Sequence, residues 1–188
     1  MFRGSITALI TPFNNDNIDE STYQSFIEWQ INQGSHGLVP CGTTGESPVL
    51  SHEEHSRVIN LCLEVAKDKV PVIAGTGSNS TEEAISLTKL AIKAGADAAL
   101  IVTPYYNKPN QRGLIEHYLK IANSVDIPII IYNIPGRSVI DMDLETLKIL
   151  SKHSNIVGIK DAAGDLARTL SSRLELNDDF SILSVILS

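Results

Sequence analysis

One lysine has the residue type and the position that nucleophilic chemistry requires. Lys160 directly follows residues 156–159, an apolar run typical of a buried strand. Burial disfavours the charged ammonium and lowers its pKa, so a neutral amine becomes available to attack a carbonyl and form a Schiff base. The alternative is an ordinary lysine at a strand end, which points into solvent or pairs with the neighbouring Asp161.

Hydroxyl side chains occur at or after other apolar runs of the same kind. Tyr132 lies at the end of the run at residues 127–133, and a phenol can pass protons while an amine adds to a carbonyl. Thr43 and Tyr106 follow two earlier runs and could complete a proton relay. Each also has a structural explanation, because tyrosine rings pack at strand ends and threonines shape turns.

Two further features suit carboxylate groups. The loop at residues 42–45 reads Gly-Thr-Thr-Gly, and its glycines let backbone amides and hydroxyls approach a 2-oxo acid closely. Arg137 lies in a loop after the run at 127–133, where a guanidinium could grip a second carboxylate in a two-pronged contact. A connection without a ligand and an exposed surface arginine are the respective alternatives.

The elements that must position these groups alternate along the chain. The apolar runs that we predict as strands are residues 5–11, 37–40, 70–75, 98–103, 127–133, 156–160 and 180–184. Most are apolar throughout, as in a parallel sheet covered on both faces, and residues 53–67 and 81–93 between them have helical periodicity. The pattern predicts an α/β fold, either an open doubly wound sheet or a (β/α) barrel.

The position of the reactive groups fits a barrel, whose active sites lie at the carboxyl ends of the strands, while the pattern alone favours neither fold by much. Six βα units and a seventh strand fit into 188 residues, whereas a closed barrel needs eight units and roughly 250 residues. We therefore expect residues 1–188 to form a single partial (β/α) barrel domain whose C-terminal units are absent. The last residues, Ser-Val-Ile-Leu-Ser, contain no turn or helix signal, so we expect the seventh strand to run into the terminus.

Composition excludes several classes of partner. The net charge is -7 and the Lys and Arg residues are scattered, which argues against nucleic acid and anionic membranes. Cys41 and Cys62 form neither a metal spacing nor a disulfide framework, which favours a reducing compartment. His52 and His55 lack matching ligands nearby, so we expect no metal. With no apolar run of about 18 residues and no signal-peptide pattern, the cytoplasm is the expected location.

Four motifs, in order along nearly the whole chain, resemble the dihydrodipicolinate synthases of the N-acetylneuraminate lyase superfamily. They are GTTGES at 42–47, TPYYNKP at 103–109, YNIPGR at 132–137 and GIKDA at 158–162. The resemblance implies a (β/α)8 TIM barrel that condenses pyruvate with L-aspartate 4-semialdehyde to 4-hydroxy-tetrahydrodipicolinate. This reaction belongs to diaminopimelate and lysine biosynthesis. The resemblance implies no cofactor, and it implies a homotetramer built as a dimer of dimers.

The resemblance also implies a role for each matching residue. Lys160 corresponds to the Schiff-base lysine, and Tyr132 corresponds to the proton donor and acceptor. Thr43 and Tyr106 correspond to the rest of the relay, with Tyr106 reaching the site of a neighbouring subunit. Thr44 corresponds to the residue that holds the carboxylate of pyruvate.

Other matching positions concern specificity and regulation. Arg137 corresponds to the residue that receives the carboxylate of the semialdehyde, and the loop around it helps to separate synthases from sialate lyases. Some relatives have a lysine-feedback site at the dimer interface, and its matching positions here are Ser47, His52, His55, Asn79, Glu83 and Tyr105. Pro48 stands where a small residue is usual, which makes feedback a less secure expectation than catalysis.

The chain departs from the family in length. Roughly a third of a usual member is absent, including the eighth strand and the helical C-terminal region. Two alternatives therefore stay open beside the synthase. One is an inactive truncated remnant of that enzyme, and the other is a related pyruvate-dependent aldolase that acts on a sugar acid.

Overall fold

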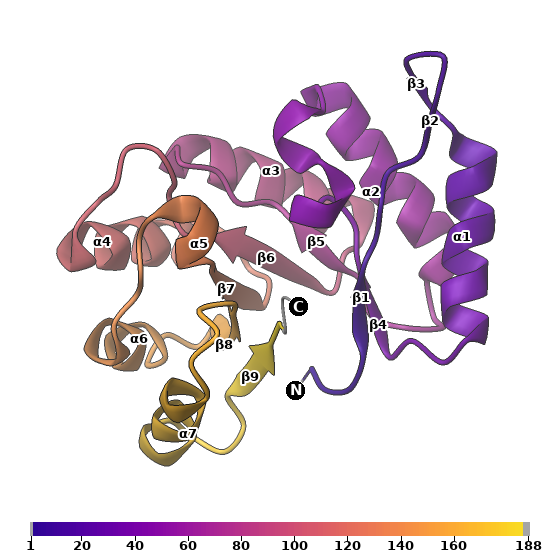
Figure 1. Cartoon of the computed structure of the whole chain (residues 1–188). Helices are drawn as coiled ribbons and strands as arrows, with labels where there is room; N and C mark the ends of the chain where they lie inside the picture. The colour runs from indigo at the N-terminus through magenta and orange to yellow at the C-terminus, as the bar shows by residue number, and fades with distance from the viewer. Residues whose placement is uncertain (1, 186–188) are drawn as a thin grey trace. The chain divides into compact units, whose positions relative to one another are not determined.

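The computed structural model describes residues 2–185, which fall into two compact units (Figure 1). The N-terminal unit comprises residues 3–76 and 87–100. The C-terminal unit comprises residues 77–86 and 101–185, together with Phe2. Helix α3 (Thr81–Ala94) and strand β6 (Ala98–Val102) contribute residues to both units.

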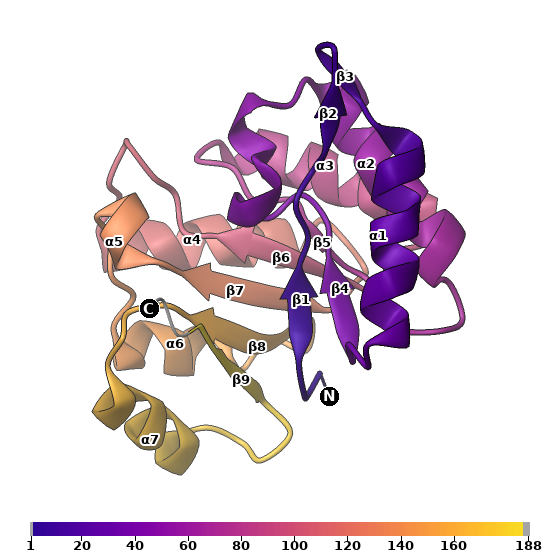
Figure 2. The ribbon, with the colours of Figure 1, turned by 45° about the vertical axis from the view of Figure 1, so that its right-hand side comes forward.

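Short parallel strands alternate with helices in the N-terminal unit. Its elements are β1 (Ile6–Ala8), β2 (Phe13–Asn14), β3 (Asn17–Ile18), α1 (Glu20–Asn32), β4 (Gly37–Val39), the 3-10 turns η1 (Thr43–Gly45) and η2 (Ser47–Val49), α2 (His52–Ala66) and β5 (Ile73–Gly75). Strand β1 pairs in parallel with β4, and β5 pairs in parallel with β6, while β2 and β3 form an antiparallel hairpin. Figure 2 shows β1 beside β4.

Apolar side chains from both the strands and the helices form the core of this unit. Helix α1 packs on α2 and buries Tyr23 and Ile27 between them and the strands, where they join Leu38, Val58 and Cys62. Burial of such side chains is the main source of stability for the unit, at about 25 cal/mol per Å² of apolar area removed from water. The core therefore fixes the position of the loop that follows β4.

Local signals explain where the helices begin and end. The side chain of Ser51 accepts the backbone N–H of Glu54, and the carboxylate of Glu54 accepts the N–H of Ser51, which together form a capping box at the start of α2. Gly95 ends α3 with a left-handed backbone at φ +98°, a conformation that other residues rarely adopt. The helices predicted at 53–67 and 81–93 are confirmed within one residue at each end.

Parallel strands and helices also alternate in the C-terminal unit. Besides the end of β6, its elements are α4 (Gln111–Ala122), β7 (Ile129–Asn133), α5 (Pro135–Ser138), α6 (Leu144–Leu150), β8 (Ile156–Asp161), α7 (Leu166–Glu175) and β9 (Ser181–Ser184). The strands follow the order β6, β7, β8, β9, and Figure 2 shows the last three side by side. The register places Tyr132 opposite Lys160 and Asn133 opposite Asp161.

Each of the seven apolar runs coincides with one observed strand, and only β8 extends beyond its run, by one residue, so the predicted alternation is confirmed. The hairpin of β2 and β3 was not predicted. Strand β9 ends at Ser184, and residues 186–188, which were expected to continue the seventh strand, lie outside the described residues. That residues 1–188 form one domain stays a prediction. None of the helices in residues 2–185 combines the length and the apolar character needed to span a bilayer.

Gly158 allows β9 to lie close to β8. A Cβ atom at this position would lie 2.6 Å from the carbonyl oxygen of Ser181, so a side chain would force the two strands apart. We expect Gly158→Ala to lower the free energy of unfolding by about 1–3 kcal/mol, which urea titration would measure. Gly136→Ala is the matched control, because a Cβ atom at Gly136 meets nothing within 4 Å. Equal stability of the two variants would contradict the close packing.

Candidate active site

Lys160 and Tyr132 meet at the ends of neighbouring parallel strands. The Nζ atom of Lys160 lies 4.2 Å from the centroid of the Tyr132 ring. Tyr132 is buried and Lys160 is half-buried. The structure therefore brings together the predicted Schiff-base lysine and the predicted proton donor.

Burial sets the acid-base behaviour of Lys160. Desolvation lowers the pKa of Lys160 below its ordinary value of 10.5, because the ammonium loses hydration when it leaves water. The face of an aromatic ring attracts a cation only weakly, by about 0.5–2 kcal/mol, so contact with Tyr132 does not replace an anionic partner. An amine in this setting is neutral in a larger fraction of molecules than an exposed lysine is.

Asp161 does not pair with Lys160, although it is the next residue in the chain. Successive side chains of a strand point to opposite faces, and the Asp161 carboxylate binds Arg168 with 3.0 Å between Oδ2 and Nε. One of the two structural alternatives for Lys160, an ion pair with Asp161, is therefore wrong. The other, a fully solvated amine, disagrees with its half-buried position.

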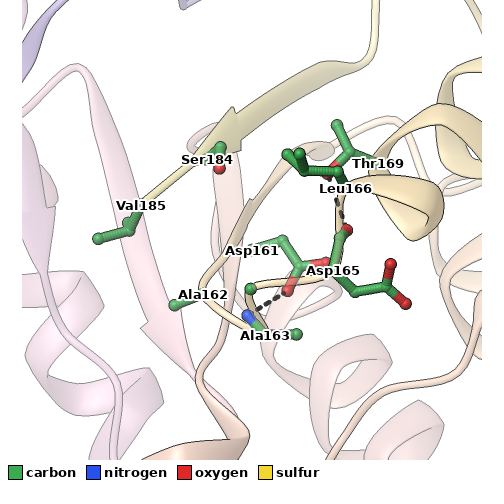
Figure 3. A pocket seen from close by; sticks show the side chains of 9 residues that line it. Asp161, Ala162, Ala163, Asp165, Leu166, Thr169, Ser184 and Val185 are labelled. Carbon is green, nitrogen blue, oxygen red and sulfur yellow. Dashed lines mark hydrogen bonds between the residues drawn. The ribbon is translucent and has the colours of Figure 1, made fainter. Parts of the chain in front are cut away.

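A cavity of about 490 Å³ lies where β8 and β9 end and α7 begins (Figure 3). Its lining includes Asp161, Asp165, Thr169 and Ser184. Figure 3 shows the Asp161 carboxylate accepting the backbone N–H of Ala163, at 3.1 Å. Lys160 and Tyr132 are not among the lining residues, so we do not assign this cavity to the carbonyl substrate.

Thr43 and Thr44 lie in η1, in the N-terminal unit. Both residues are exposed, while the Gly45 that follows them is buried. The Thr11 hydroxyl donates a hydrogen bond to the Gly45 carbonyl at 2.8 Å and so anchors the turn. A Cβ atom on Gly45 would lie 2.9 Å from the carbonyl oxygen of Leu9, so this close approach requires glycine. The loop thus presents two threonines on an anchored backbone.

Tyr106 and Arg137 both project from the C-terminal unit into solvent. Tyr106 is 89% exposed and has a left-handed backbone, with φ 68°, which is uncommon for a bulky side chain. Arg137 is exposed on the short helix α5. The buried Ser138 hydroxyl fixes this helix through the carbonyls of Ile134 and Ile140, at 2.9 and 3.0 Å. The positions of both residues leave them free to meet molecules from outside this unit.

The six residues matched to a lysine-feedback site are divided between the units. Ser47, His52 and His55 lie in the N-terminal unit, and Asn79, Glu83 and Tyr105 lie in the C-terminal unit. His55 is buried, with 2.9 Å between its Nε2 atom and the carbonyl oxygen of Gly75. The Glu83 carboxylate accepts the Ser78 hydroxyl. One matched residue in each unit, His55 and Glu83, thus makes a defined hydrogen bond within its own unit. A feedback role for the six residues stays a prediction.

The two cysteines are unsuited to nucleophilic chemistry. Cys41 and Cys62 are free and buried, and burial raises the pKa of both thiols, to about 12 for Cys62. Within residues 2–185, no group of three or more His, Cys, Asp or Glu side chains could hold a metal ion.

Sequence reasoning missed the polar residues behind the reactive pair. Asn133 and Arg168 bind the Asp161 carboxylate on the face of the sheet opposite Lys160, and both also bind Asp141. Asn133 and Asp161 do lie inside the recognised motifs, directly after Tyr132 and Lys160, and that adjacency is the one signal that could have indicated them.

The lowered pKa of Lys160 predicts its reactivity toward amine reagents. Acetic anhydride attacks the neutral amine, so the labelling rate of Lys160 should rise with a midpoint below pH 10.5. Peptide mass spectrometry of labelled samples across a pH series would measure it. The same lysine in urea-unfolded chain is the control, with an expected midpoint near 10.4, roughly the ordinary value. Coincident midpoints in the folded and unfolded chain would contradict the desolvation.

Comparison with known proteins agrees with this geometry. Residues 1–185 match the profile of the Dihydrodipicolinate synthetase family. A 4-hydroxy-tetrahydrodipicolinate synthase of Rhodospirillum centenum is 67% identical over 184 residues, which are 98% of this chain and 63% of that protein. The chain therefore spans less than two thirds of the length of this relative.

Solved structures show the same fold. The chloride-inhibited dihydrodipicolinate synthase of Acinetobacter baumannii, complexed with pyruvate, superimposes with a TM-score of 0.96 at 49% identity, over 98% of this chain and 64% of that one. The enzyme of Cyanidioschyzon merolae with lysine bound gives a TM-score of 0.93 at 41% identity, over 96% and 62%. The fold is part of a (β/α)8 barrel, and the chain belongs to the dihydrodipicolinate synthetase family.

Proposed function

We propose that this chain carries the Schiff-base chemistry of a 4-hydroxy-tetrahydrodipicolinate synthase, which joins pyruvate to L-aspartate 4-semialdehyde. The observation that carries the proposal is the half-buried Lys160 amine, held 4.2 Å from the Tyr132 ring centroid and without the Asp161 carboxylate as a partner. Relatives with this name, and a related structure that holds pyruvate, support the choice of substrates. The chain spans about 63% of such a relative, so the activity belongs to the proposal.

The chemistry begins with the neutral amine of Lys160. Its lone pair attacks the C2 carbonyl of pyruvate, a C–N bond forms, and the carbonyl oxygen takes a proton to give a carbinolamine. Loss of water gives the imine. Removal of a proton from the pyruvate methyl group gives an enamine, whose C3 atom bonds to the aldehyde carbon of the second substrate. The amino group of the second substrate then attacks the imine carbon and displaces the Lys160 amine, which closes the ring of 4-hydroxy-tetrahydrodipicolinate.

Each of these steps moves a proton, and the Tyr132 ring lies 4.2 Å from the amine, measured to its centroid. We assign Tyr132 the transfers to and from the substrate oxygen and the leaving water. Thr43 and Tyr106 extend the relay toward solvent, and Thr44 holds the carboxylate of pyruvate. Arg137, exposed on α5, receives the carboxylate of the semialdehyde.

We further propose that the chain works in a homo-oligomer, a dimer of dimers in the cytoplasm. The exposed Tyr106 supports this, because bulky side chains with left-handed backbones cluster at functional sites and this one is open to a neighbouring molecule. Feedback by lysine at the six matched residues is part of the same proposal. Its support is the bound lysine in the Cyanidioschyzon merolae structure.

Reduction with borohydride tests the Schiff base. With pyruvate present, we expect one adduct on Lys160, with the mass of pyruvate less one water and plus two hydrogens, because borohydride reduces the imine irreversibly. Lys160→Arg should give no adduct at the peptide that contains residue 160. A chain that gives a sharp melting transition but no adduct would contradict the proposal and identify an inactive remnant.

Removing the phenol hydroxyl should slow the proton steps. We expect Tyr132→Phe to reduce exchange of the pyruvate methyl protons with deuterated water by roughly 100-fold or more, as loss of a general acid-base group does. Proton NMR of pyruvate would measure the rate. Tyr23→Phe is the control, because it removes a hydroxyl from a buried tyrosine of the N-terminal unit that has no assigned role. Equal exchange rates in the two variants would exclude Tyr132 from the relay.

Arg137→Ala tests the second substrate. The KM for L-aspartate 4-semialdehyde should rise by roughly tenfold or more, because a charge-assisted contact is lost, while the yield of pyruvate adduct stays unchanged. Parallel assays with sialic acid and keto-deoxy sugar acids complete the experiment. Turnover of a sugar acid alone would overturn the assignment in favour of a sugar-acid aldolase.

A further inference from the structure

A closed polar network lies behind the reactive pair, on the opposite face of β7 and β8. The Asn133 amide nitrogen donates to Asp141 at 2.9 Å and to Asp161 at 3.1 Å. Arg168 from α7 binds the same two carboxylates, with Nε 3.0 Å from Asp161 and Nη1 2.6 Å from Asp141. It also donates to the carbonyl of Met142. One helix is thereby joined to the ends of two strands.

Burial makes this network strong and specific. Asn133 is fully buried, Asp161 is 9% exposed and the Arg168 side chain is 16% exposed. Asp141 is about half exposed, so water screens its charge while Asp161 depends on Arg168 for compensation. In many proteins, well-packed apolar residues in place of a buried ion pair give equal or greater stability. The presence of charges here therefore suggests a purpose other than stability.

The charge of Asp161 matters for Lys160 because the two residues are adjacent in the chain. A free carboxylate at that position would stabilise the ammonium form of the lysine. The register partners of Lys160 are Tyr132 on β7 and Leu183 on β9, and neither carries a formal charge at neutral pH. Among the described residues of the C-terminal unit, Asp161 is thus the adjacent anion that has to be kept away from the amine.

We propose that Arg168 and Asn133 are positioning residues, which bind the Asp161 carboxylate and compensate its charge on the face of the sheet where strand alternation places it, and so keep the Lys160 amine available as a nucleophile. The inference rests on the proposed function, because that function gives the Lys160 amine its role. The effect of Arg168 and Asp161 on the amine can be measured without any substrate. Arg168 acts through Asp161 and touches neither Lys160 nor Tyr132 among its recorded contacts.

The test measures acetic anhydride labelling of Lys160 against pH, without pyruvate. Arg168→Gln removes a cation and leaves the Asp161 charge uncompensated beside the amine. The labelling midpoint should move to higher pH, and the rate at pH 8 should fall by roughly three- to tenfold. Arg168→Gln combined with Asp161→Asn should return the midpoint toward that of the natural chain. Arg168→Lys, which keeps the charge, should also restore it in part.

Arg173→Gln is the matched control. Arg173 lies on the same helix, is exposed, and binds only the carbonyls of Asp178 and Phe180 in the described hydrogen bonds. Its loss should leave the midpoint unchanged. If Arg168→Gln unfolds the chain, the single variant Asp161→Asn provides the test. Removing the anion while Arg168 stays should move the labelling midpoint of Lys160 to lower pH.

Two results would overturn the inference. One is a midpoint that stays the same or falls in folded Arg168→Gln, and the other is a midpoint that rises in Asp161→Asn. A failure of the proposed function would look different, because the pyruvate adduct would be absent while these midpoints still moved as expected. The two proposals can therefore fail separately.

Discussion

The parallel register between β7 and β8 is the constraint on which the site depends. It sets Tyr132 opposite Lys160 and, one step further, Asn133 opposite Asp161. Because side chains alternate between the faces of a strand, this register places the amine and the phenol together on one face and the acidic network on the other. A slip of one residue would move Lys160 to the other face and separate the amine from the phenol. Strand pairing thus determines chemistry as well as fold.

Burying an amine also has a consequence for stability. The pKa of Lys160 is lower in the folded chain than in the unfolded chain, so the unfolded chain binds more protons between the folded pKa and about 10.4, the ordinary value. In that window this group makes the free energy of unfolding rise with pH, and below it the group destabilises the fold by a constant amount. The same lowering of the pKa thus makes the neutral amine available at lower pH and makes the fold less stable there.

The sequence predicted the strands and the reactive pair because both leave local signals. Continuous apolar runs mark buried parallel strands, and Lys160 and Tyr132 end two of them. The network around Asp161 leaves no such signal, since Arg168 reaches it from a helix and Asn133 from another strand.

The hairpin of β2 and β3 was missed although Asn15 and Asp16, both with left-handed backbones, form a recognisable two-residue turn. The anchoring of the turn with Thr43 and Thr44 by Thr11 depends on a contact between residues distant in sequence, which periodicity does not encode.

The most direct test of the account is a crystal structure of the chain after borohydride reduction with pyruvate. The account predicts a carboxyethyl group on the Lys160 Nζ atom, on the same face of the sheet as the Tyr132 ring, with the Asp161 carboxylate bound to Arg168 on the other face. Side chains of residues 132 and 160 on opposite faces, or an Asp161 carboxylate paired with the Lys160 amine, would contradict it.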